Sequence, residues 1–223
     1  MKNSRRKCVT ISIILLVIAV VYTVLVKYVD VKAIGPQGSE VGFSILNKFV
    51  HGLLPFNETF YKISKYAGLL PFGFVAAYGL HGFINLIKNK GFKKMDKKYI
   101  ILGLFYIIFV AMYLFFEKIP INYRPVIVKG ALEASYPSTH TLIAICLCGT
   151  SLIVSKQLIK NDTMRLLFDI AAWCLMIGIV ITRIISGVHW ASDIIGGILL
   201  SITYLAFFKC SLLHLNDREL TVA

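Results

Sequence analysis

The chain has 223 residues, of which 57% are hydrophobic, and it carries a formal net charge of +13. Its mean hydropathy of +0.76 excludes an ordinary soluble domain and predicts an integral membrane protein. The positive charge does not indicate a nucleic-acid partner, because the lysines and arginines cluster in short segments between apolar runs, where they set membrane topology. We therefore expect one all-α, polytopic membrane domain over residues 1–223.

The first apolar run and the segment after it predict an anchored N-terminus. Residues 9–26 form a core too long for a cleaved signal peptide, and no small-residue cleavage site follows, so we expect an uncleaved first span. Residues 43–54, FSILNKFVHGLL, repeat apolar side chains at helical spacing. This pattern predicts a helix lying in the membrane interface between the first two spans.

Further apolar runs complete a predicted bundle of six transmembrane helices. The six candidate spans are residues 9–26, 69–87, 99–116, 141–155, 166–185 and 194–208. Crossing the hydrocarbon takes about 20 helical residues. The fourth and sixth spans reach that length only if their helices begin in the polar residues just before them, near Pro137 and His189.

Basic residues predict how the bundle is oriented. They concentrate in residues 2–7, in the links 88–98 and 156–165, and in the C-terminal tail. The positive-inside rule makes this the cytoplasmic side, so an even number of spans leaves both termini in the cytoplasm of a multi-pass cell-membrane protein. The other connections, residues 27–68, 117–140 and 186–193, are then expected on the outer face.

Three polar clusters fall on that outer face, at the ends of spans three to six. They are KIPINYRP at 118–125, YPSTH at 136–140 and TRIISGVHWASD at 182–193. The candidate site residues in them are Lys118 and Arg124; Ser138, Thr139 and His140; and Arg183, His189 and Asp193.

The third cluster predicts an oriented histidine. His189 and Asp193 are four residues apart, so on a helix they share one face. An aspartate that accepts the Nδ1–H of the imidazole leaves Nε2 with a free lone pair, as a nucleophile or base requires. The alternative is that these ionisable residues only mark the end of a span.

The other two clusters supply groups that suit a phosphate. Pro137 is typical of a first helical turn, whose free N–H groups attract an anion next to the Ser138 hydroxyl. His140 can protonate a leaving oxygen, while Arg124 offers a bidentate fork to phosphate oxygens. No carboxylate cluster of the kind that holds Mg²⁺ accompanies them, so we expect no cofactor or metal, with arginines neutralising the charge.

Together the motifs resemble the signature of the type-2 phosphatidic acid phosphatase superfamily, which reads K-x6-R-P, P-S-x-H and S-R-x5-H-x3-D. Residues 137–140, PSTH, match the second motif in full, and residues 182–193 match the third with Thr182 in place of serine. In the first motif Lys118 lies one residue too close to Arg124, and Glu117 occupies the expected position. The motif-bearing part extends from residue 118 to 197.

The resemblance implies a metal-independent phosphatase acting on a lipid phosphate or diphosphate from the outer face. It implies His189 as the nucleophile that becomes phosphohistidine, Asp193 as its orienting group and His140 as the acid. It also implies a phosphate site made of Arg124, Arg183, Lys118, Ser138 and the amide of Thr139. Phosphatidic acid, phosphatidylglycerol phosphate and undecaprenyl diphosphate all remain open as substrates. The alternatives are a phosphoryl transferase and a non-catalytic lipid-binding or transport protein.

Overall fold

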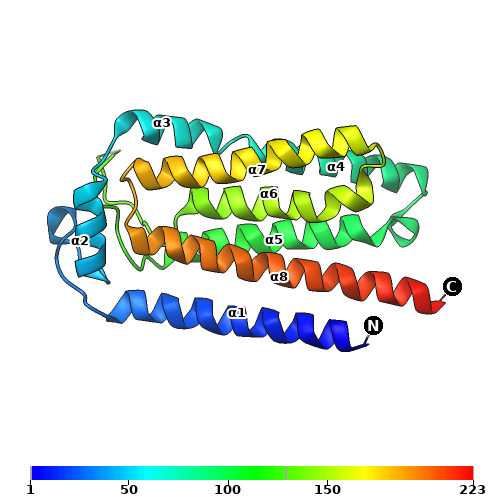
Figure 1. Ribbon diagram of the computed structural model, residues 1–223, viewed down its shortest axis with the longest axis horizontal. Helices are drawn as coiled ribbons and strands as arrows, with labels where there is room; N and C mark the ends of the chain where they lie inside the picture. Colours follow the sequence, from blue (N-terminus) through cyan, green and yellow to red (C-terminus); the bar gives the residue numbers. More distant parts are fainter. Residues whose placement is uncertain (1, 129, 223) are drawn as a thin grey trace.

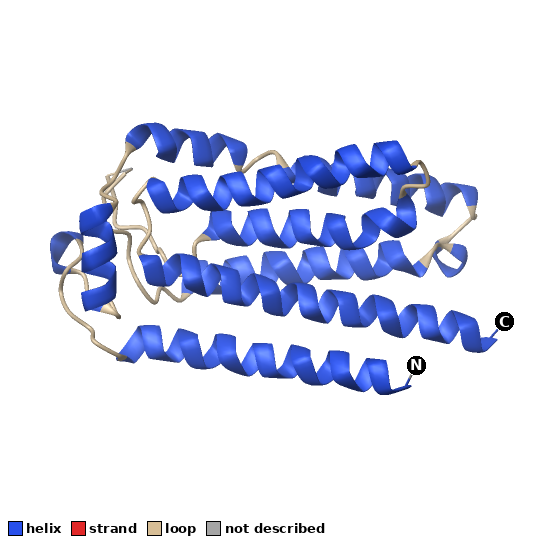
Figure 2. Cartoon of the chain, in the orientation of Figure 1, coloured by secondary structure: helices blue, strands red, loops and turns tan. Residues whose placement is uncertain are grey.

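A computed structural model describes residues 2–128 and 130–222 of the chain; Met1, Lys129 and Ala223 of the expected domain lie outside the described residues. The elements are helices connected by short links and loops (Figures 1 and 2). The helices are α1 (Lys2–Tyr28), α2 (Ser44–Leu53), α3 (Glu58–Ala67), α4 (Pro71–Lys88), α5 (Lys97–Lys118), α6 (Thr139–Leu158), α7 (Asp162–Ile185) and α8 (Ala191–Val222), with short 3-10 helices η1 (Pro36–Gly38) and η2 (Phe92–Lys94).

The prediction of an all-α bundle with six spans is confirmed. Within the described residues, six helical segments are long and apolar enough to cross a membrane, α3 and α4 counting together as the segment Glu58–Lys88. α6 and α8 begin at Thr139 and Ala191, each two residues after the start that the polar residues had predicted. These two spans therefore carry polar groups at their first turns.

α6 forms the centre of the bundle, packed against α4, α5, α7 and α8. It is the most buried of the six candidate spans, because small residues such as Ala144, Cys148 and Gly149 line it and let neighbouring helices approach closely. Aromatic side chains of α5 and α8 fill the remaining space, with Phe105 stacked edge-on against Phe208. α1 lies at the edge of the bundle, beside α8 (Figure 1).

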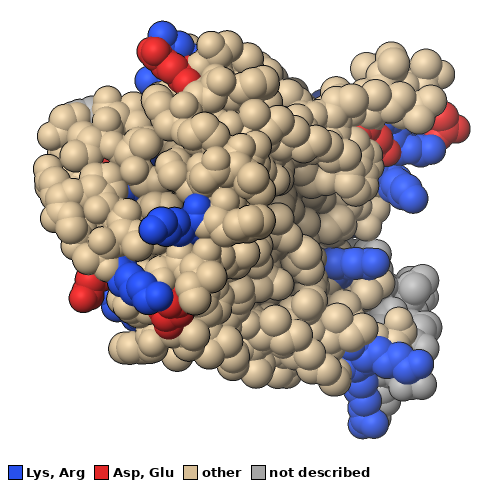
Figure 3. Space-filling view, turned by 60° about the vertical axis from the view of Figure 1, so that its left-hand side comes forward, with Lys and Arg blue, Asp and Glu red and all other residues tan. Residues whose placement is uncertain are grey.

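The two ends of the bundle differ in what they carry. Both termini and the basic links lie at one end, and the loops that bear the three polar clusters lie at the other (Figure 1). In the space-filling view the charged side chains form small groups, separated by wide uncharged surface (Figure 3). The expected separation of basic links from polar clusters is therefore present in the fold.

The predicted helix at residues 43–54 is confirmed as α2, which lies across the end of the bundle that carries the polar clusters (Figure 1). Its side chains Ile45, Phe49 and Leu53 are exposed, which suits contact with lipid at an interface. The opposite side of α2 is anchored by Asn47, which donates a hydrogen bond to Ser192 Oγ at 2.8 Å and accepts one from Ser192 N at 3.0 Å.

α3 is a helix that the sequence did not predict, since residues 27–68 were otherwise assigned to an outer segment. The sequence of α3, ETFYKISKYA, contains no long apolar run that would predict a span. It forms a short amphipathic helix that packs against α7. Asn57 caps it by accepting a hydrogen bond from Phe60 N at 3.1 Å. This short helix leads directly into α4 through residues 68–70.

Candidate active site

A short antiparallel pairing holds the first two polar clusters together. Tyr123 and Ala134 form an isolated bridge, flanked by hydrogen bonds from Arg124 N to Glu133 O at 3.1 Å and from Ser135 N to Asn122 O at 2.8 Å. The chain after α5 is thereby fixed beside the chain that leads into α6. Arg124, Asn122 and Ser135 all come to the same region through this pairing.

His189 lies in the loop between α7 and α8, so the prediction that it shares a helix face with Asp193 is wrong in this respect. Gly187 turns the chain there with a φ of 59°, a left-handed conformation that favours glycine. A side chain on Gly187 would also meet the backbone of Leu54 and Pro55 at 2.6 Å. Asp193 is in the first turn of α8, and its Oδ2 is 3.9 Å from His189 Nδ1, too far for a direct hydrogen bond.

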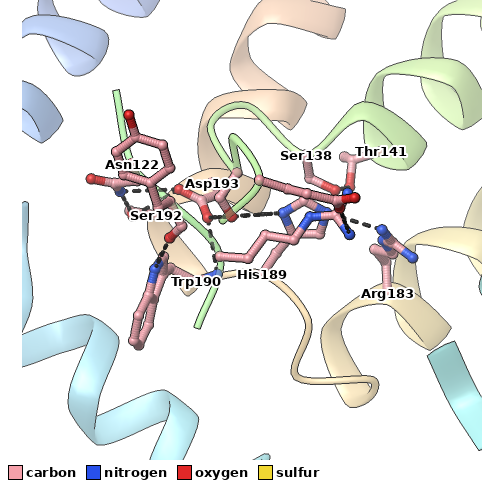
Figure 4. A network of polar contacts seen from close by, with 12 residues as sticks. Asn122, Ser138, Thr141, Arg183, His189, Trp190, Ser192 and Asp193 are labelled. Atoms are coloured by element: carbon pink, nitrogen blue, oxygen red, sulfur yellow. Dashed lines mark hydrogen bonds and ion pairs between the residues drawn. The ribbon is translucent and has the colours of Figure 1, made fainter. Parts of the chain in front are cut away.

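The hydroxyl of Ser135 lies between the two side chains. It donates a short hydrogen bond to Asp193 Oδ2 and is 3.0 Å from His189 Nδ1. On the other side of the imidazole, Nη2 of Arg183 is 3.1 Å from Nε2 (Figure 4). Because a guanidinium only donates, Nε2 is the acceptor and the neutral ring carries its proton on Nδ1, which donates to Ser135. The imidazole therefore has the predicted tautomer, but the Ser135 hydroxyl connects its Nδ1–H to the Asp193 carboxylate.

Asp193 is fully buried and is held by several donors. Its Oδ1 accepts from Asn122 Nδ2 at 3.1 Å, and its Oδ2 also accepts from Trp190 N at 3.0 Å (Figure 4). The Trp190 indole in turn donates to the carbonyl of Tyr123 at 2.6 Å. A buried carboxylate needs such partners to remain in place, and here they fix its position relative to the histidine.

Two arginines approach the same region from different elements. Arg183 lies in the last turn of α7 and is 1% exposed, and its Nη1 donates to Ser64 Oγ at 3.1 Å. Arg124 forms an ion pair with Glu133, with 2.7 Å between Nη1 and Oε2. Among the described residues, the buried Nε of each arginine has no hydrogen-bond partner. Each therefore retains an N–H donor for an anion.

The pKa of His189 is lowered well below its usual value. Burial is the main cause, followed by the positive charges of Arg183, Arg124 and His140. The imidazole is therefore neutral at pH 7, the form in which Nε2 can act as a nucleophile. These charge effects also indicate that the two arginines and both histidines lie near one another.

The start of α6 supplies polar backbone groups. Ser138 is the N-cap, and its side chain accepts no capping hydrogen bond from the N–H groups of the first turn. Ser138 N donates to the carbonyl of Asp193 at 3.0 Å, and Ser138 Oγ accepts from Thr141 Oγ1 at 3.0 Å (Figure 4). Thr139 and His140 are the first two helical residues and are partly buried. A helix N-terminus of this kind is suited to bind phosphate.

Lys118 differs from the two arginines in its surroundings. It is the last residue of α5, its side chain is exposed, and it makes no hydrogen bond or ion pair within the described residues. Several contacting residues were missed by the sequence, chiefly Ser135, Asn122, Glu133 and Ser64. Asn122 lies within the first cluster and Ser135 immediately precedes the second, whereas nothing in the sequence near Ser64 indicated a site.

In the part of the chain that the structure describes, no three His, Cys, Asp or Glu side chains gather as a metal site.

Two comparisons with known proteins found a match. A sequence model described as the PAP2 superfamily matches residues 116–216, which contain all of the polar clusters. The fold is similar to the crystal structure of the first transmembrane PAP2 type phosphatidylglycerolphosphate phosphatase from Bacillus subtilis, with a TM-score of 0.54 and 16% identity over 92% of this chain and 96% of that chain. At this identity the likeness is one of fold. No curated protein matches the sequence.

Proposed function

We propose that this chain, whose residues 116–216 match the PAP2 superfamily, releases phosphate from a lipid phosphate or diphosphate through a phosphohistidine at His189. One observation carries the proposal: the neutral imidazole has its Nδ1 proton directed through Ser135 to Asp193 and its Nε2 directed toward Arg183. A purely structural histidine needs no such orientation between a buried acid and a buried cation.

The first half of the reaction transfers the phosphoryl group to the protein. Nε2 of His189 attacks phosphorus, the bond from phosphorus to the lipid oxygen breaks, and protonated His140 gives its proton to that oxygen. The imidazole becomes cationic as the new P–N bond forms, and the buried Asp193 carboxylate stabilises it through Ser135. The two arginines neutralise the equatorial oxygens of the transferring group.

The second half regenerates the protein. A water molecule attacks phosphorus, neutral His140 takes the water proton, and the P–N bond breaks to return the electron pair to Nε2. Phosphate leaves, and His140 is again protonated for the next cycle. The phosphate replaces the contact between Arg183 and Nε2, and the unpartnered Nε groups of both arginines supply donors to its oxygens.

Apolar space beside His189 supports a substrate with a hydrocarbon tail. A cavity of about 170 Å³ lies between α2, the end of α7 and the first turns of α8, with His189, His51 and Ile195 in its wall. A second, wholly apolar cavity of about 550 Å³ lies between α6, α7 and α8. Ile198 lines both. We propose that the tail follows this route while the head group meets the histidines.

The outer membrane face is the proposed location of the reaction. The basic links and both termini lie at the end of the bundle opposite the site (Figure 1), and the positive-inside rule assigns that end to the cytoplasm. Among lipid phosphates, the name of the similar Bacillus subtilis protein favours phosphatidylglycerol phosphate as the first substrate to test. Phosphatidic acid and undecaprenyl diphosphate are the alternatives.

The test is phosphate release by the purified protein in detergent with EDTA present, using each of these three lipids. We expect release to persist in EDTA and to be lost in His189→Ala, while His214→Ala, an exposed histidine further along α8, retains it. Release that requires added metal would contradict the arginine-based mechanism. Binding of the lipid without loss of its phosphate would favour the lipid-binding protein, and formation of a phosphate ester of an added acceptor alcohol, without free phosphate, would favour the transferase.

A further inference from the structure

α3 contributes no residue to the three motifs, yet its inner face contacts two of the site residues. Tyr61, Ser64 and Gly68 are spaced three and four residues apart, so they share one side of the helix. Gly68 is the C-cap and keeps helical φ and ψ values of −62° and −13°, which extends the face by one residue. Tyr61 and Ser64 are buried.

The first two of these residues hold Arg183. Ser64 Oγ donates to the carbonyl of Tyr61 at 3.0 Å and accepts from Arg183 Nη1 at 3.1 Å. The Tyr61 ring lies under the guanidinium, 5.5 Å from Cζ to the ring centroid, a distance at which a cation is attracted to the ring face. The guanidinium is thereby fixed with Nη2 at His189 and Nε unpartnered.

The third residue sets the position of His140. A Cβ on Gly68 would lie 2.5 Å from Cδ2 and 3.2 Å from Nε2 of the His140 ring. The backbone of Gly68 is in an ordinary helical conformation that any residue adopts, so conformational freedom does not explain the glycine. Space does: the imidazole packs directly on the backbone at the end of α3.

We propose that α3 is a positioning element that sets the cation behind the nucleophile and the leaving-group acid on one rigid face. Tyr61, Ser64 and Gly68 do not touch the substrate; they act through Arg183 and His140. This inference rests on the proposed function of the same site. It predicts two separate effects: Gly68 influences proton donation through His140, and Ser64 influences phosphate binding through Arg183.

The leaving group distinguishes these effects. Phenyl phosphate and p-nitrophenyl phosphate have almost the same size, but p-nitrophenolate departs without a proton while phenolate needs one from the acid. In Gly68→Ala we expect kcat/KM to fall about 10- to 100-fold for phenyl phosphate and less than about threefold for p-nitrophenyl phosphate. kcat/KM is the parameter to use, because it reports the steps up to loss of the leaving group.

The matched control is Gly73→Ala, two residues into α4, where an added Cβ meets nothing within 4 Å. It should behave as the unchanged protein with both substrates. Ser64→Ala should give the opposite signature, a similar rise in KM for both substrates with no dependence on the leaving group. Tyr61→Phe should retain activity and Tyr61→Leu should resemble Ser64→Ala, because only phenylalanine keeps the ring under the cation.

An equal loss for both substrates in Gly68→Ala, or no loss at all, would overturn the inference. If Gly68→Ala does not fold, as judged by gel filtration and thermal melting, the pair Tyr61→Phe and Tyr61→Leu decides, and equal activity in that pair overturns it. Failure of the unchanged protein to release phosphate from any substrate instead overturns the proposed function, so the two failures are distinct.

Discussion

Removing the Ser135 hydroxyl tests the connection between the histidine and its carboxylate. In Ser135→Ala the Nδ1–H of His189 loses its acceptor, and the nearest oxygen of Asp193 is 3.9 Å away. Both side chains are almost completely buried, so water does not readily replace the hydroxyl. The imidazolium formed during phosphoryl transfer is then less stabilised, and the proton on Nδ1 is no longer fixed.

The magnitude follows from the contact that is lost. A hydrogen bond that involves a charged group contributes about 1.5–3 kcal/mol, and about 1.4 kcal/mol corresponds to a tenfold change in rate. We therefore expect kcat/KM for a lipid phosphate to fall about 10- to 150-fold, with KM changing little because Ser135 contacts neither arginine. Phosphate release measured over a range of lipid concentrations separates the two parameters.

Ser201→Ala provides the control. Ser201 is also buried, and its replacement by alanine also removes only a hydroxyl. It lies two turns beyond Asp193 on α8, away from the histidine. It should retain normal kinetics. If Ser135→Ala stays within about twofold of the unchanged protein, His189 contacts Asp193 directly in the reacting state and the relay through serine is refuted.

Three further predictions follow from the site. Since the pKa of His189 is lowered and the neutral imidazole attacks, the acidic limb of kcat/KM against pH should lie below the usual histidine range. Arg124→Gln removes one of the cations that lower the pKa of His189 and should therefore move this limb to higher pH. An unmoved limb would contradict the assignment of the limb to His189. Lys118→Ala should lower kcat/KM less than Arg124→Ala in the same assay, because Lys118 is exposed; an equal loss would mean that its side chain reaches the phosphate. Ile195→Trp fills part of the cavity beside the histidine and should raise KM for a long-chain lipid phosphate but not for a short-chain one, and an equal rise for both would place the tail elsewhere.

The spans and the motif residues were predictable because their signals are local. Apolar runs of sufficient length specify membrane helices, and a proline with serine and histidine indicated the start of α6 within two residues. α3 was missed because its ten residues alternate polar and apolar groups over too short a stretch to be distinguished from an outer loop. The prediction that His189 shares a helical face with Asp193 was wrong because the turn at Gly187 separates the histidine from α7.

The contacts that orient the site were not predictable, because they join residues far apart in the sequence. Ser64 and Arg183 are separated by 119 positions and Ser135 and Asp193 by 58. A buried arginine or aspartate can be predicted to need partners, but the sequence does not identify which hydroxyl supplies them. Serines are too common in this chain for their presence near a motif to indicate a role.

Two adjacent glycines explain how the relay through Ser135 forms at all. Gly196 and Gly197 lie one turn after Asp193 on α8, where a run of isoleucines and leucines would otherwise be unbroken. A Cβ on Gly196 would lie 2.3 Å from the Tyr136 ring, and one on Gly197 would lie 3.1 Å from Thr141. Tyr136 immediately follows Ser135, so this close approach allows the chain entering α6 to lie against α8.

The hydrogen bond from Ser138 N to the carbonyl of Asp193, at 3.0 Å, then joins the starts of the two helices. One rigid unit thus contains the first turn of α8 with the Asp193 carboxylate, the first turn of α6, and Ser135 between them. The glycines at 196 and 197 would be read from the sequence as helix-packing residues of a membrane span. Their packing partner is the segment that carries the second motif, so the same close contact that assembles the bundle also places Ser135 between His189 and its carboxylate.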